Sequence, residues 1–146
     1  MISRTVLVAA EDFGEAVTAD RAGGAIGRGI RARDATLAVD LCPLRASAGA
    51  HATAGDYLAA LDFDARMRAA RALVVGVDRL DETTLLGSLT FELATRARQS
   101  GVPAYAVAGT NALSLFDARV LDLQVVLTAR NARALRRAGE KLAELV

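Results

Sequence analysis

Residues 73–108 read LVVGVDRLDETTLLGSLTFELATRARQSGVPAYAVA, and this stretch contains a strand, a helix and a second strand. Residues 73–77 (LVVGV) are continuously apolar, which is typical of a strand buried on both faces. Asp81 can cap a helix over residues 82–99, and residues 103–108 form the next strand. A strand, a helix and a strand in this order predict two parallel strands in one sheet.

The helix expected over residues 82–99 has an apolar face and a defined end. Ser100 and Gly101 provide its stop, because glycine readily adopts the left-handed conformation that ends helices. An apolar face at helical spacing should pack on the sheet. The residues that we expect on this face are Leu86, Leu89, Leu93, Ala94 and Ala97.

The same alternation of strands and helices runs through the rest of the chain. Further strands are expected at residues 5–10, 35–41 and 121–127. Helices are expected at residues 18–31, in two short stretches within 57–71, and from residue 131 onward. Strands separated by helices indicate an α/β fold, and we predict a Rossmann-like three-layer α/β/α domain with a mainly parallel sheet of about five strands.

Two of these helices carry additional signals. Thr18 is a suitable N-cap for the helix at residues 18–31. This helix contains several glycines, some of which we expect to face a close-packed strand or helix. They are Gly23, Gly24, Gly27 and Gly29. In the C-terminal helix the residues expected to be buried are Leu135, Ala138, Leu142 and Leu145.

The composition fits a single globular domain and excludes several function classes. A chain of 146 residues is long enough for one core. Its 18 basic and 17 acidic residues leave a net charge of +1, so no strong field attracts nucleic acid or an anionic membrane. Aromatic residues make up only 4%, which argues against base stacking. We expect no nucleic-acid and no membrane partner, and, because the first residues do not resemble a signal peptide, a cytoplasmic location.

Cysteine and histidine chemistry has few candidate residues. Cys42 is the only cysteine, and His51 is the only histidine. We expect Cys42 to be a buried, inert residue at the end of a strand and His51 to be exposed in a loop. A Cys42–His51 nucleophilic pair would lack a third group to orient it. The spacing of the ligand-type residues predicts no metal site.

Residues 45–55 (RASAGAHATAG) form the loop or linker of the chain. The segment is small, polar and rich in glycine and alanine, and its apolar residues follow no period. Such a segment cannot bury one face against a core, so we expect it to be exposed and mobile.

Four segments resemble motifs of class I glycerate kinases. Residues 8–19 read VAAEDFGEAVTA, and residues 43–51 read PLRASAGAH. Residues 62–88 (DFDARMRAARALVVGVDRLDETTLLGS) and 100–109 (SGVPAYAVAG) are similar to the family's late segment, and this match is long and in register. The resemblance covers most of the chain and implies a Rossmann-like domain.

Glycerate kinases of this class are far longer and have a second domain, with the active site between the two. The resemblance implies that the present chain keeps the domain that is built from both ends of the family's chain and lacks the other. We therefore expect residues 1–146 to form one domain, with residues 45–55 as the junction that replaces the second domain.

The residues that carry chemistry in the family are the ones that differ here. The family's two motif lysines fall on Gly14 and Ser88, and the glutamate of its GEGRLD motif falls on Val77. Its acidic, glycine-rich ADGGEG motif falls on residues 45–50, which contain no carboxylate. Phosphoryl transfer requires cations or Mg²⁺ at the phosphates and a carboxylate to orient the nucleophile. Judged by the resemblance, these differences indicate a non-catalytic relative.

The candidate ligand-binding residues follow the expected strands, because open parallel sheets bind ligands outside the carboxyl ends of their strands. They are Glu11, Asp12, Asp78, Arg79, Asp81, Thr110 and Asn111. One interpretation is a small polar pocket for an anion or a hydroxy acid. The other is structural: Asp81 caps its helix, Arg79 pairs with nearby acids, and residues 109–111 are a turn.

Three hypotheses for the function follow. The leading one is a stand-alone, glycerate-kinase-like domain without kinase activity and without a cofactor, which binds a small organic acid or acts by assembly. The alternative is a minimal glycerate kinase or another small-acid enzyme, with ATP and Mg²⁺, whose candidate catalytic residues are Asp12, Asp78, Arg79 and Asp81. The third is a subunit that lends its domain to another chain.

We also expect self-association as a homodimer. The surface that faces the second domain in the family would lack its cover here, and the mean hydropathy of +0.28 is high for a chain of this size. A two-fold interface buries one self-complementary patch on both subunits. The candidate surfaces are the helix at residues 18–31 and the segment 113–116 (LSLF).

Overall fold

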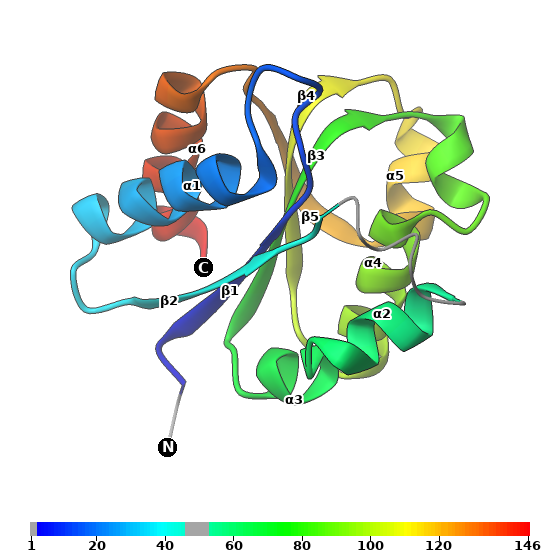
Figure 1. Cartoon of the computed structure of the whole chain (residues 1–146), viewed down its shortest axis with the longest axis horizontal. Helices are drawn as coiled ribbons and strands as arrows, with labels where there is room; N and C mark the ends of the chain where they lie inside the picture. Colours follow the sequence, from blue (N-terminus) through cyan, green and yellow to red (C-terminus); the bar gives the residue numbers. More distant parts are fainter. Residues whose placement is uncertain (1–2, 46–52) are drawn as a thin grey trace.

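A five-stranded parallel sheet forms the centre of the computed structural model, which describes residues 3–45 and 53–146 (Figure 1). The strand order is β2-β1-β3-β4-β5, and all neighbouring strands run parallel. The strands are β1 (Thr5–Ala10), β2 (Ala38–Pro43), β3 (Ala72–Leu80), β4 (Ala104–Asn111) and β5 (Leu123–Thr128). The order changes direction between β1 and β3, so the sheet is doubly wound.

Helices cover both faces of this sheet, which confirms the predicted three-layer α/β/α fold. One face carries α1 (Ala19–Arg33) and α6 (Ala132–Leu145), seen side by side in Figure 1. The helices of the other face are α2 (Ala54–Ala60), α3 (Phe63–Arg68), α4 (Leu89–Gln99) and α5 (Leu115–Leu121). A short 3₁₀ helix, η2 (Glu82–Leu85), lies between β3 and α4.

Two helix starts have polar caps, and the one at Thr18 was predicted from the sequence. The Thr18 hydroxyl accepts a hydrogen bond from the backbone N–H of Arg21 at the start of α1. At the start of α6, the Asn131 side chain accepts one from Ala134 at 2.9 Å. Each cap satisfies a backbone donor that has no partner within its helix.

The contact between α1 and α6 depends on two glycines, which confirms the expectation that some glycines of α1 face a close neighbour. A Cβ atom at Gly29 would lie 1.9 Å from the carbonyl oxygen of Arg136. A Cβ atom at Gly139 would lie 2.1 Å from the carbonyl oxygen of Ile26. The two backbones therefore touch where side chains are missing. Because α6 occupies the Gly29 side of α1, that side is not available to a second copy of the chain.

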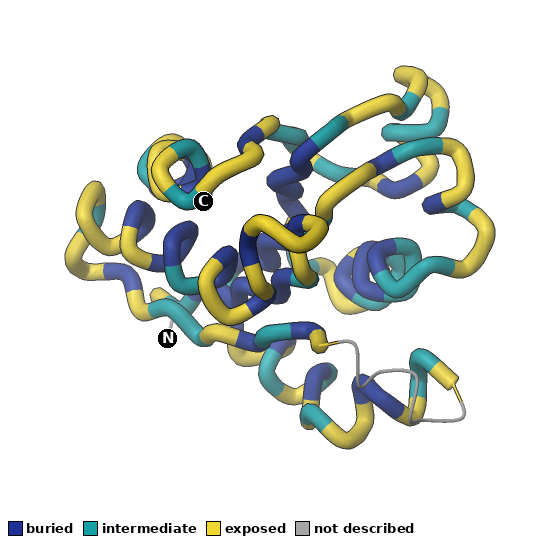
Figure 2. Tube along the Cα trace, turned by 45° about the horizontal axis from the view of Figure 1, so that its top comes forward, coloured by how far each residue is buried: buried dark blue, intermediate teal, exposed yellow. Residues whose placement is uncertain are grey.

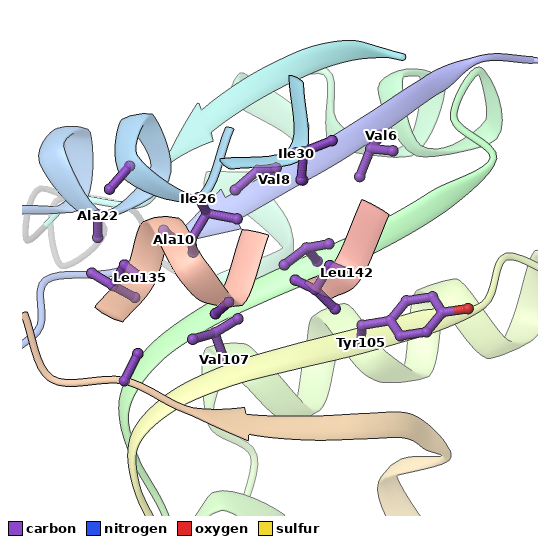
Figure 3. Close-up of a cluster of buried hydrophobic side chains, with 14 of the residues drawn as sticks. Val6, Val8, Ala10, Ala22, Ile26, Ile30, Tyr105, Val107, Leu135 and Leu142 are labelled. Atoms are coloured by element: carbon purple, nitrogen blue, oxygen red, sulfur yellow. The ribbon is translucent and has the colours of Figure 1, made fainter. Parts of the chain in front are cut away.

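Buried apolar residues form a core on each side of the sheet, visible as the dark segments in Figure 2. The core between the sheet, α1 and α6 includes Val8, Ile26, Ile30 and Leu142, which Figure 3 shows converging. The opposite core includes Phe63, Leu93 and Cys42. The Cys42 side chain is buried, as predicted, and burial raises the pKa of its thiol.

The single helix predicted over residues 82–99 is wrong. Gly87 has a φ of +89° and separates η2 from α4, and Ser88 begins α4 by accepting a hydrogen bond from Phe91. As a result, Leu86 does not share the buried face of α4 and is 81% exposed. The prediction for α6 has one similar error, because Leu145 at its end is exposed while Leu135, Ala138 and Leu142 are buried.

Several boundaries also differ from the sequence-based expectations. β4 extends to Asn111, so residues 109–111 are part of a strand and not a turn. β2 begins later than predicted and includes Pro43. α2 begins at Ala54, within the expected loop of residues 45–55, and α5 was not predicted.

Residues 46–52, including His51, lie outside the described part of the chain. In residues 3–45 and 53–146, no helix has the length and apolar character that a membrane span requires.

Candidate functional site

The carboxyl ends of β1, β3 and β4 carry the candidate residues, at the edge where a doubly wound sheet binds its ligands. Glu11 and Asp12 follow β1, Asp78 lies near the end of β3, and Thr110 and Asn111 end β4. Three arrangements result: an acidic group at β1 and β3, an Arg79–Asp81 pair, and a polar depression between β4 and β5.

Glu11 is half-buried between the strand ends and α4. Its carboxylate accepts a hydrogen bond from the Thr90 hydroxyl at 3.3 Å, and its backbone N–H donates to the carbonyl oxygen of Gly76. Burial raises the pKa of Glu11; the Thr90 hydrogen bond opposes this shift, and the nearby negative charge of Asp12 adds to it. Thr90 is buried in the first turn of α4 and was missed by the sequence reasoning. In the sequence, a threonine within a helix gives no indication that its hydroxyl donates a hydrogen bond to a distant carboxylate.

Asp12 supports the start of α1. Its carboxylate oxygen Oδ1 accepts a hydrogen bond of 2.7 Å from the backbone N–H of Ala19. A carboxylate at this place interacts favourably with the positive end of the helix dipole. Asp12 therefore has a structural role that accounts for its position without a ligand.

The Asp78 carboxylate lies between the loop after β1 and the end of β4. A Cβ atom at Gly14 would lie 3.8 Å from its Oδ2 atom, and one at Gly109 would lie 3.2 Å from its Oδ1 atom. A Cβ at Gly109 would also meet the carbonyl oxygen of Asp78 at 2.6 Å, so β4 approaches β3 closely here. Gly14 stands at the position of the family's first motif lysine. It has a φ of +59° and faces the Asp78 carboxylate.

Arg79 and Asp81 have mainly structural partners, as the structural interpretation of the sequence predicts. The Arg79 Nε atom donates to Asp81 Oδ2 at 2.8 Å. Asp81 caps η2 by accepting hydrogen bonds from the backbone and the hydroxyl of Thr83, and its own N–H donates to the Thr84 hydroxyl. The Thr83 hydroxyl, and next the Arg79 guanidinium, hold the pKa of Asp81 below its usual value.

Thr110 and Asn111 lie at a depression of about 500 Å³ between the ends of β4 and β5. The Arg130 side chain spans its wall, because Nε donates to the carbonyl oxygen of Gly109 at 2.9 Å and Nη2 lies 3.4 Å from the Thr110 hydroxyl. Asn111 accepts a hydrogen bond from the backbone N–H of Leu113. The lining residues are Gly109, Thr110, Asn111, Thr128, Ala129, Arg130 and Ala134.

Arg130 was not among the residues singled out in the sequence. One of many scattered arginines, it lies just after β5, and only the fold brings it beside the end of β4. The candidate residues thus do not form a single site. The acidic side chains lie at the ends of β1 and β3, whereas Arg130 lies at the ends of β4 and β5. Within residues 3–45 and 53–146, no three potential metal-ligating side chains are grouped so that they could hold an ion.

Two solved structures are similar to this chain. The chain is similar to a proposed glycerate kinase 2 from Salmonella typhimurium LT2, with 17% identity and a TM-score of 0.48 over 73% of this chain. The chain spans only 27% of that kinase. A proposed pilus assembly-related protein from Burkholderia pseudomallei K96243 shares 21% identity, with a TM-score of 0.54 over 99% of this chain and 93% of that one. At 21% identity, the likeness to this second structure shows a shared fold and nothing about activity.

Comparison by sequence identifies the family. No curated protein matches the chain significantly. The sequence model of the Glycerate kinase family matches residues 46–146, which include β3, β4, β5 and the helices after them. These residues contain the two long segments that resemble glycerate kinases, and they make up more than half of the chain. The chain therefore belongs to the Glycerate kinase family.

Proposed function

We propose that this domain binds a small organic acid at the depression between β4 and β5 and does not transfer phosphate. The observation that carries the proposal is the grouping of Arg130, Thr110 and Asn111 around that depression. A guanidinium can bind a carboxylate through two parallel hydrogen bonds. Arg130 is held by the Gly109 carbonyl, so its orientation is fixed before a ligand arrives.

The acidic group at β1 and β3 supports the absence of kinase activity. ATP phosphates need cations, but Glu11, Asp12 and Asp78 place carboxylates at this edge. Of the positions that match the family's lysines, Gly14 has no side chain and Ser88 supports α4, by donating to the carbonyl oxygen of Thr84 and accepting from Phe91. A polyphosphate would therefore meet repulsion where the family places positive charge.

Calorimetric titration with D-glycerate tests the ligand. We expect Arg130→Gln to weaken binding by about tenfold or more, because it removes a charge-assisted hydrogen bond. Arg133→Gln is the matched control, because Arg133 is exposed on α6 and does not line the depression. Equal binding by the two variants, or no binding of D-glycerate or simpler carboxylates by the wild type, would contradict the proposed site.

A coupled assay with ATP, Mg²⁺ and D-glycerate tests the other half of the proposal. We expect no turnover above background. Turnover would favour a minimal kinase or another small-acid enzyme, and Asp78→Asn would then be the first variant to measure, because Asp12 and Asp81 already cap helices.

The role of residues 45–55 and the location of the protein in the cell are also proposals. We propose that residues 45–55 stand where longer family members carry their second domain. A cytoplasmic location is likewise proposed, and cell fractionation tests it.

A further inference from the structure

We propose that two copies of this chain pair through the outer edge of β5, antiparallel about a two-fold axis at Val126. The two five-stranded sheets would then join into one continuous sheet. The proposal concerns the strand edge and does not require the ligand proposed above, but it shares Arg130 with that site, so the dimer is measured without added carboxylate.

The outer edge of β5 lacks the charges and proline that commonly protect strand edges, although a register shift between Leu123 and Val126 makes its pairing with β4 irregular. β5 is the last strand of the sheet, and among residues 3–45 and 53–146 no strand pairs with its outer side (Figures 1 and 3). Its sequence, LQVVLT, has no charged residue and no proline. Exposed strand edges of this kind invite pairing with another strand, and monomeric proteins usually protect them.

The opposite edge of the sheet, β2, shows such protection. Asp40 lies in this strand, and Arg66 bonds both of its carboxylate oxygens, at 3.0 and 2.7 Å. Arg66 also donates to the Leu41 carbonyl oxygen at 2.9 Å, and Pro43 removes one backbone donor from β2. The β2 edge of the chain thus carries a charged pair and a proline, whereas the β5 edge carries no charge and no proline.

Three apolar side chains on α5, the helix that precedes β5, are exposed. Leu115 is 86% exposed, Phe116 is 75% exposed and Val120 is 38% exposed. α5 directly precedes β5, and a two-fold axis perpendicular to the sheet keeps both copies of α5 on the same face. Pairing of the strands would therefore place both copies of α5 on the same side of the joined sheet, where any contact between their apolar side chains would be favourable.

The charges at the two ends of β5 are complementary under this symmetry. Asp122 lies four residues before Val126, and Arg130 lies four residues after it. Antiparallel pairing about Val126 places Asp122 opposite the second copy's Arg130, and the symmetry makes this pair twice. Both residues are exposed, and within residues 3–45 and 53–146 the hydrogen bonds of the Arg130 side chain come from Nε and Nη2. This complementarity favours a second copy of the chain over an unrelated partner.

Sedimentation equilibrium at micromolar concentration tests the proposal. The expected mass of the wild type is twice 15.2 kDa. In the proposed register Gln124 faces Thr128 of the second copy, so Gln124→Lys with Thr128→Lys places like charges opposite each other. Both residues are exposed, so this variant should stay folded by circular dichroism and sediment at 15.2 kDa.

Ala38→Lys with Leu41→Lys is the matched control, because both residues are exposed on the β2 edge. This variant should remain a dimer. Asparagine tolerates the left-handed backbone of residue 122, so Asp122→Asn should stay folded. This variant should raise the dissociation constant of the dimer about fivefold and make that constant less dependent on salt. A wild-type mass of 15.2 kDa, a dimer that survives the β5 lysines, or a dimer lost only with the β2 lysines would overturn the proposal. An unchanged Asp122→Asn dimer would overturn the proposed register.

Discussion

The contact between α1 and α6 makes a sharp prediction about Gly139. In Gly139→Ala the new methyl group would lie 2.1 Å from the carbonyl oxygen of Ile26, far inside van der Waals contact. The obstacle is backbone in the middle of a helix, so it cannot rotate away as a side chain can. The two helices must separate by about 1 Å, and the close packing of Ile26, Ile30 and Leu142 between them is lost.

The expected cost follows from two opposing effects. Overpacking a core costs about 1–3 kcal/mol, and a backbone obstacle places this case at the upper end. Replacing glycine by alanine inside a helix stabilises the helix by about 1 kcal/mol. We expect the free energy of unfolding to fall by about 2 kcal/mol, which corresponds to a fall in melting temperature of roughly 4–8 °C for a chain of this size.

Gly24→Ala is the matched control for this prediction. It makes the same substitution in the same helix pair, but its methyl group would meet only the flexible end of Arg28, at 3.4 Å. This variant should gain about 0.5–1 kcal/mol of stability. Urea unfolding of the three proteins, compared at equal m-values, measures both changes. If Gly139→Ala were as stable as Gly24→Ala, the close approach of the two backbones would be refuted.

Three more predictions follow from local contacts. Ser88→Ala should lower the free energy of unfolding by about 1 kcal/mol in a urea titration, because it removes the N-cap of α4; no change would mean that η2 and α4 behave as one helix. Glu11→Gln should stabilise the protein at neutral pH. Burial raises the pKa of Glu11 above 4.5, so the stability that its protonated carboxyl group contributes is fully present below pH 4.5 and is lost as the pH rises through the folded-state pKa. Unfolding curves at pH 7 and pH 4 should therefore show the gain only at the higher pH, and an equal gain at both would contradict the burial of this carboxylate. Cys42 should react with a thiol reagent only after unfolding, and rapid reaction in the native protein would show that its side chain is accessible.

Features that depend on neighbouring residues could be predicted from the sequence. The cap at Thr18 acts within one turn of its own helix, so residue type and position are sufficient. The apolar runs that became β1, β3 and β4 are long enough to be distinctive. The start of α4 had a local signal that was overlooked, because Gly87 can end one helix and Ser88 can cap the next. The helical spacing of Leu86 with the later apolar residues instead suggested one continuous helix.

The candidate site depends on contacts between distant residues, and these were not predictable. Thr90 and Glu11 are 79 positions apart, and Arg130 reaches Gly109 from a different strand end. Nothing in the sequence near Arg130 separates it from the other arginines. The structural interpretation of Arg79 and Asp81 could be stated beforehand because their partners lie within three residues.

Transfer of radiolabelled phosphate from ATP tests the central claim most directly. The wild-type protein is incubated with labelled ATP, Mg²⁺ and D-glycerate, and the products are separated and counted beside a protein-free control. Because carboxylates occupy the edge where the family has lysines, we predict no labelled phosphoglycerate above the control. Labelled phosphoglycerate in amounts exceeding the protein present would show turnover and contradict the claim that this member of the family does not transfer phosphate.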